Sequence, residues 1–91
     1  MQSSIKVGSV VLSTAGHDSG DYFVVIEVEN DEYVKICDGR LRTLEKPKRK
    51  KIKHLKNTFL TLDKIAEKLL ANEIIHNKNI QTALKEIVPK E

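Results

Sequence analysis

The strongest chemical signal in the sequence is a run of cations between Glu45 and Lys56. This segment holds seven lysine and arginine side chains against the carboxylate of Glu45, a local charge of +6, whereas the whole chain carries +3. Like charges packed so closely repel one another unless counter-ions or phosphates lie near. Lysine and arginine displace condensed counter-ions from a nucleic-acid backbone, which gives an affinity that falls with salt. The run therefore predicts a polyanion partner, with a solvated, flexible charge run as the alternative.

Two further groups of polar residues extend this candidate surface. Arg40 and Arg42 lie two residues apart, which places them on one face of a strand. The loop around Gly16 offers hydroxyl, imidazole and backbone N–H donors for phosphates or 2′-hydroxyls, although Asp18 and Asp21 add negative charge there. The candidate contact residues are Arg40, Arg42, Lys46, Lys48, Arg49, Lys50, Lys51, Lys53, His54, Lys56, Ser13, Thr14, Gly16 and His17.

Catalysis and metal binding have little support in the sequence. The three histidines are far apart and none stands at metal-ligand spacing from a second ligand. Gly16 and Gly20 lack the partner residues and the following helix of a nucleotide-binding loop. Cys37 is interpreted as a small, semi-buried residue rather than a reactive thiol. We therefore expect a protein that is not an enzyme and that binds no metal, cofactor or small-molecule substrate.

Short strands followed by helices must position these residues. β-branched and aromatic residues alternate with turn signals in the first half of the chain, which indicates strands. The expected strands lie at about residues 8–13, 21–29, 32–37 and 40–44, with turns at Asn30-Asp31 and Asp38-Gly39. Pro47 predicts a loop to about Lys51, followed by a short edge strand at about residues 53–55.

The last third of the chain has a helical pattern. Apolar residues recur there at a period near 3.6, which predicts one helix capped by Thr61 and a second, capped by Asn77 or Asn79, that Pro89 ends. The apolar stripes are expected to pack on the strands, with a partner-binding face as the alternative. Four or five short strands within about 50 residues favour a small, strongly bent barrel, partly covered by these helices.

Composition fits one small soluble domain. The chain has 91 residues, of which 40% are apolar and 32% charged, enough for a single small core. No apolar run approaches the roughly 18 residues of a membrane span, so no membrane association is expected. Cys37 is the single cysteine and cannot form an internal disulfide, which is consistent with a reducing cytosol.

The segment from Ser9 to Glu29 resembles a KOW motif. Its parts are a strand, a loop with a glycine at its turn, a second glycine four residues later, and an apolar strand. Here these are Val10-Val11-Leu12, Gly16, Gly20 and Phe23-Val24-Val25. The likeness covers about residues 5–60, through DGRLR at 38–42 and EKPKRKKIKHL at 45–55. In this longer form the chain is similar to bacterial KOW-domain RNA-binding proteins related to the L-fourteen-e ribosomal protein family. Ser19 departs from the pattern, which usually has a lysine or arginine there.

The resemblance implies a mainly β protein with α: an SH3-like barrel of about five strands in residues 1–60, with the basic segment 46–56, and a packed helical appendage in residues 61–91. It implies a cytoplasmic ribosomal or ribosome-associated protein that binds ribosomal RNA, with ribosomal proteins as further partners of the helical tail. We expect RNA shape and phosphates to be recognised more than bases, because the sequence offers few aromatics. The alternatives are an SH3-like protein-interaction adaptor in translation or transcription, and a transcription-factor fragment.

Overall fold

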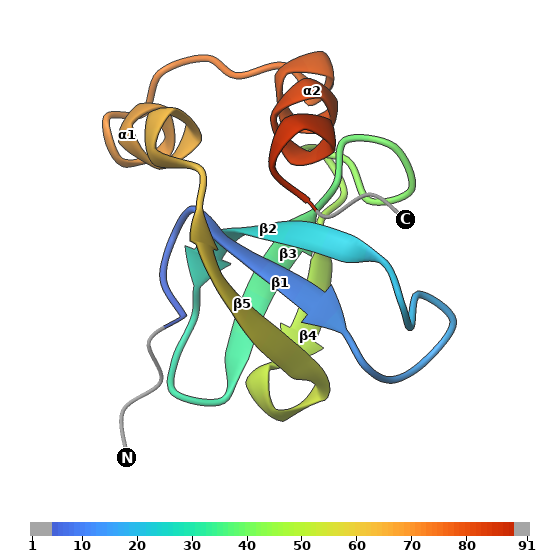
Figure 1. The fold of residues 1–91 in the computed structure, drawn as a ribbon. Coiled ribbons are helices and arrows are strands. Elements are labelled where there is room, and N and C mark those ends of the chain that lie inside the picture. Colours follow the sequence, from blue (N-terminus) through green and yellow to red (C-terminus); the bar gives the residue numbers. More distant parts are fainter. Residues whose placement is uncertain (1–4, 89–91) are drawn as a thin grey trace.

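A computed structural model describes residues 5–88, which form a five-stranded antiparallel sheet followed by two α-helices (Figure 1). The strand order is β4-β3-β2-β1-β5. The predicted class, mainly β with two helices after the strands, is confirmed. The elements are β1 (Ser9–Ser13), β2 (Tyr22–Val28), β3 (Tyr33–Cys37), β4 (Lys48–Lys51), the short 3-10 helix η1 (Ile52–His54), β5 (Leu55–Thr61), α1 (Asp63–Leu70) and α2 (Asn77–Ile87).

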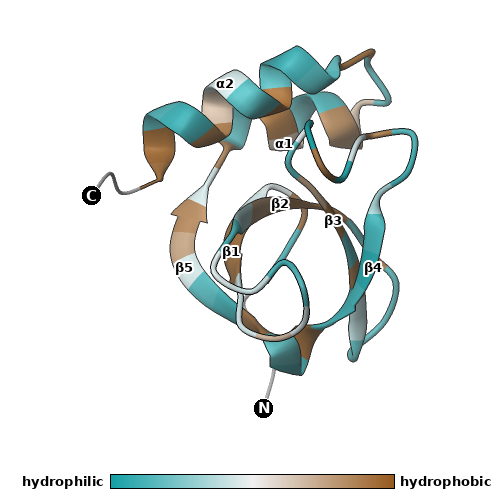
Figure 2. Cartoon of the chain, turned by 90° about the vertical axis from the view of Figure 1, so that its right-hand side faces the viewer, coloured by the Kyte–Doolittle hydropathy of each residue, from teal (hydrophilic) through white to brown (hydrophobic). Residues whose placement is uncertain are grey.

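The sheet curls strongly, with β4 and β5 as its two edges (Figure 2). The pairing of β2 with β3 shifts register between Val25 and Glu27, and that of β1 with β5 shifts between Val10 and Val11. Such bulges bend a strand and increase its twist, which accounts for the curl. Both helices lie on the same side of the sheet (Figures 1 and 2). Within residues 5–88 neither helix is long and apolar enough to cross a membrane.

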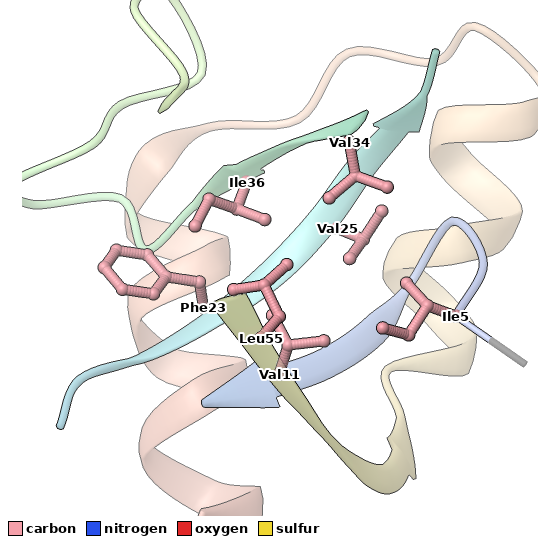
Figure 3. Packing of buried hydrophobic residues seen from close by; sticks show 7 residues of the cluster. All are labelled: Ile5, Val11, Phe23, Val25, Val34, Ile36 and Leu55. Atoms are coloured by element: carbon pink, nitrogen blue, oxygen red, sulfur yellow. The ribbon is translucent and has the colours of Figure 1, made fainter. Parts of the chain in front are cut away.

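One hydrophobic core lies inside the curled sheet. Its side chains come from β1, β2, β3, β5 and the segment before β1, and they point toward one another (Figure 3). Phe23 and Ile36 are fully buried here, and burial of such a side chain contributes about 1.5–3 kcal/mol. The members of this core are Ile5, Val11, Phe23, Val25, Val34, Ile36 and Leu55.

A second core fills the space between the sheet and the helices. It takes the alternate residues of the same strands, because successive strand side chains point to opposite faces. Burial on both faces explains why β1 and β2 read as continuous apolar runs. The buried members are Val10, Val24 and Cys37 from the sheet, Leu62 and Ile65 at α1, and Ile80 and Leu84 from α2. The apolar stripes of both helices therefore pack on the sheet, except for Leu70 at the end of α1, which is exposed.

The prediction of a strand at residues 40–44 is wrong. The Asp38 carboxylate accepts hydrogen bonds from the backbone N–H groups of Arg40 and Arg42 at 2.9 and 3.0 Å. This local turn competes with strand pairing, because it satisfies the same backbone donors. Helix α2 also holds the loop, since Gln81 Nε2 donates to the Gly39 carbonyl at 2.7 Å. Arg40 and Arg42 therefore do not share a strand face.

The basic run is also more regular than predicted. Residues 48–51, expected in a loop, form β4. Residues 52–54 form η1, and the edge strand expected at about residues 53–55 is instead the longer β5, at Leu55–Thr61. Lysine has a low strand preference, but edge strands are commonly rich in lysine. Strand β4 is such an edge, and its Lys50 forms a buried ion pair with Asp18.

The helix caps differ from the predictions as well. Leu62, not Thr61, is the N-cap residue of α1. Helix α2 begins after His76, whose backbone N–H donates to Asn79 Oδ1 at 3.0 Å. Neither predicted residue is therefore the N-cap: Asn77 is the first helical residue, and Asn79 stabilises the N-terminus of α2 from within the first turn.

Candidate nucleic-acid interface

The basic run forms an ordered edge of the sheet. Its alternate side chains point to opposite faces of β4. Arg49 and Lys51 therefore share the outer face with Tyr33 and Lys35 of β3, whereas Lys50 and the half-exposed Lys48 lie on the face of the buried core. The antiparallel register that fixes this is Tyr33↔Lys51, Val34↔Lys50, Lys35↔Arg49 and Ile36↔Lys48.

Lys50 is buried, unlike its neighbours in the run. Its Nζ lies 2.9 Å from Asp18 Oδ1 and donates to the Ala15 carbonyl at 2.7 Å. The Ser13 hydroxyl donates to the same carboxylate oxygen at 3.0 Å. Burial acts to raise the pKa of Asp18, but the hydrogen bonds from Lys50 and Ser13 hold it below its ordinary value. The ion pair thereby fixes the loop after β1 onto β4.

This pairing changes the electrostatics of the candidate site. The negative charge of Asp18, expected to repel phosphates, is compensated by Lys50 inside the protein. Ser13 and Lys50 are only 1% and 7% exposed. Both are candidate contact residues from the sequence, and their burial removes them from the exposed surface. Asp21 remains exposed.

The loop of residues 14–21, here called the Gly16 loop, is also joined to η1. The backbone N–H and the hydroxyl of Thr14 both donate to the His54 carbonyl at 2.9 Å. Gly16 and Gly20 adopt φ angles of +86° and +94°, a region that glycine occupies without steric cost. The Gly16 loop, β4 and η1 therefore form one hydrogen-bonded unit.

Arg49 is held in one orientation by two neighbours that sequence analysis did not select. Its Nε donates to Glu29 Oε1 at 2.8 Å, and this hydrogen bond raises the pKa of Arg49. Its guanidinium carbon lies 3.6 Å from the centre of the Tyr33 ring, and Lys51 Nζ lies 5.9 Å from it. Alternation in β3 places Tyr33 on the same face as Lys35. The contacts of Tyr33 with Arg49 and Lys51 follow only from the pairing of β3 with β4.

The structure brings most of the predicted contact residues onto adjoining segments. We call the exposed and half-exposed cations Lys48, Arg49, Lys51, Lys53 and Lys56 the basic surface. Thr14, Gly16, His17 and His54 lie in the Gly16 loop and η1 beside it. Arg42 and Lys46 lie in the loop before β4. Arg40 is not part of this group, since it lines a hollow with residues of α2 such as Lys78 and Lys85.

In the part of the chain that the structure describes, neither Cys37 nor a cluster of acidic and histidine side chains offers a metal site. Cys37 is fully buried, and burial raises the pKa of its thiol to about 12, so the reactive thiolate is not formed at neutral pH. Within residues 5–88 no group of three or more histidine, cysteine, aspartate or glutamate side chains is placed to hold a metal ion. A comparison of the chain with models of known protein families finds no match.

Proposed function

We propose that this protein binds RNA without catalysis, through the basic surface together with the Gly16 loop. The observation that carries the proposal is that the cations of residues 48–56 lie on the paired strands β4 and β5 and on η1 between them. An ordered array of side chains loses less conformational entropy on binding than a flexible charge run. The buried pair of Lys50 and Asp18 supports the same conclusion, because it removes a carboxylate from the surface.

We further propose that the curled sheet is an SH3-like barrel of the KOW type and that its ligand is ribosomal RNA. The strand, glycine loop and strand of residues 9–28 support this proposal, as does the basic run fixed against that loop. Ser19 stands where the KOW pattern usually has a cation, so the basic surface supplies most of the affinity. On this proposal the protein is a cytoplasmic ribosomal or ribosome-associated component.

Salt dependence gives the first test. Four phosphate contacts by Lys48, Lys51, Lys53 and Lys56 should give a slope of log K against log salt of about −2.8 to −3.6, between the single-strand and duplex coefficients. Fluorescence anisotropy with a structured ribosomal RNA fragment, titrated from about 50 to 300 mM salt, measures this slope. A slope near zero would contradict the proposal.

Charge reversal gives the second test, with a control that carries the same net charge. The variant Lys51→Glu, Lys53→Glu, Lys56→Glu changes side chains without an ion pair among the described residues, and it leaves Lys50 in place. We expect it to abolish binding at about 150 mM salt, because it removes three contacts and adds repulsion. The control reverses three exposed helix lysines, Lys64, Lys68 and Lys78, and should bind as the wild type does. An equal loss of RNA affinity in both variants would contradict the proposal, because it would show that RNA binds elsewhere or responds only to the net charge of the protein.

A protein-interaction adaptor is the second candidate function. Leu70 and Ile74, at and after the end of α1, are 72% and 81% exposed, and exposed apolar side chains that lie together mark protein-interaction sites. Sedimentation of cell extracts separates the two functions. Association with ribosomal particles that nuclease abolishes supports RNA binding, whereas a nuclease-resistant complex that is lost on Leu70→Ser, Ile74→Ser supports the adaptor.

A further inference from the structure

Arg49 is oriented for a directional contact rather than a diffuse charge interaction. Its guanidinium stacks 3.6 Å from the centre of the Tyr33 ring and is fixed at Nε by Glu29. Arginine has five N–H donors; the one at Nε goes to Glu29, and the guanidinium also interacts with the Tyr33 side chain. Most donors of the two terminal NH₂ groups therefore remain for a ligand, on a side chain that is 53% exposed.

The charge around this fork favours a neutral acceptor over a phosphate. The Glu29 carboxylate lies 2.8 Å from Arg49 Nε and offsets much of the positive charge. A phosphate bound at the fork would come close to that carboxylate, and like charges repel. Guanine presents two neutral acceptors, O6 and N7, at a spacing that a guanidinium matches with two hydrogen bonds. An unpaired base in an RNA loop or bulge exposes this edge to a protein.

We propose that Arg49, positioned by Tyr33 and Glu29, binds the O6 and N7 edge of an unpaired guanine and gives this protein a base preference. The inference rests on the proposed RNA-binding function and adds to it. The remaining cations of the basic surface contact phosphates and supply affinity that does not depend on sequence. Tyr33 and Glu29 are positioning residues here, because they act through the orientation of Arg49.

Short oligouridines with one central substitution test the base preference directly. We expect the wild-type protein to bind the oligomer with a central guanosine about 5- to 150-fold more tightly than the one with adenosine. A central 7-deazaguanosine, which lacks the N7 acceptor, should lose most of this gain. Equal affinity for all three oligomers, with the salt dependence intact, would overturn this inference and leave the proposed function standing. No binding to any of them or to structured RNA would overturn both.

Arg49→Lys keeps the charge but removes the planar fork. It should bring the ratio of guanosine to adenosine affinity to about one, within error. Arg40→Lys is the matched control, since Arg40 lies on the α2 side of the molecule, and it should keep the wild-type ratio. Tyr33→Phe retains the ring and should keep the ratio, whereas Tyr33→Leu should reduce it. A wild-type ratio in Arg49→Lys, with folding verified by circular dichroism, would refute the assignment.

Discussion

Replacement of Lys50 by methionine should strongly destabilise the protein, because it leaves the Asp18 carboxylate buried without its cation. The two side chains are 8% and 7% exposed and their charged atoms lie 2.9 Å apart. After the change, Asp18 Oδ1 keeps the hydrogen bond from Ser13, while Oδ2 is buried and has no hydrogen-bond partner among the described residues. Removal of one partner from such a pair costs about 3–5 kcal/mol.

That loss is large for a protein of this size, because small domains are stable by only about 5–15 kcal/mol. Asp18→Asn leaves a lysine whose long chain can move its ammonium toward water, so its cost should be smaller. The double variant Lys50→Met, Asp18→Asn buries no charge and should cost about 1–2 kcal/mol, close to a lost hydrogen bond. The coupling energy between the two positions should therefore be about 2 kcal/mol or more.

Urea unfolding of the wild type, both single variants and the double variant, followed by circular dichroism, gives the four free energies of this cycle. Equal m-values across the set would indicate that the same surface is exposed on unfolding in each variant. The reasoning is refuted if Lys50→Met costs less than about 1 kcal/mol, or if the two single effects simply add.

The remaining predictions concern pH and two glycines. The folded protein holds the pKa of Asp18 below the ordinary 3.8, so as pH falls the Asp18 carboxylate is protonated first in the unfolded chain. The ion pair therefore contributes its full stability above about pH 5, and this stability is lost as pH falls through the pKa of Asp18 in the folded protein. The urea midpoint should therefore drop between about pH 5 and pH 2, and an identical drop in Asp18→Asn would count against this cause. Gly20→Ala should cost about 1–2 kcal/mol, because Gly20 has φ +94° and open space at its Cβ position. Gly39→Ala should cost clearly more in the same assay, because an added Cβ would also meet the Asn77 backbone carbonyl, and equal costs would disprove that contact.

Much of the fold could be predicted from local patterns. The apolar runs and glycines placed β1, β2 and the Gly16 loop to within one or two residues, since both features act over a few neighbouring positions. The turn at Asn30-Asp31 is confirmed, because Asn30 Oδ1 accepts from the N–H groups of Glu32 and Tyr33, two and three residues away. Alternation along β3 also explains why Cys37 lies on the face opposite Val34 and Ile36.

Local patterns failed where a distant residue decides the structure. The segment 48–51 looks like a solvated loop by composition, yet it is a strand because β3 offers a free edge and because Asp18 accepts Lys50 from 32 positions away. Conversely, residues 40–44 look like a strand, yet their backbone N–H groups donate to the Asp38 carboxylate and, at Leu44, to Asn77 Oδ1 of α2.

The sequence by itself determined that this protein concentrates its positive charge between residues 46 and 56, beside a small β-sheet. Tertiary structure alone decided what each cation does. Lys50 is buried against Asp18, whereas Arg49 is turned outward on Tyr33 and fixed by Glu29, 20 residues away in the chain. Adjacent side chains on a strand point to opposite faces, so strand pairing separates two neighbouring cations into a structural residue and a candidate contact with RNA.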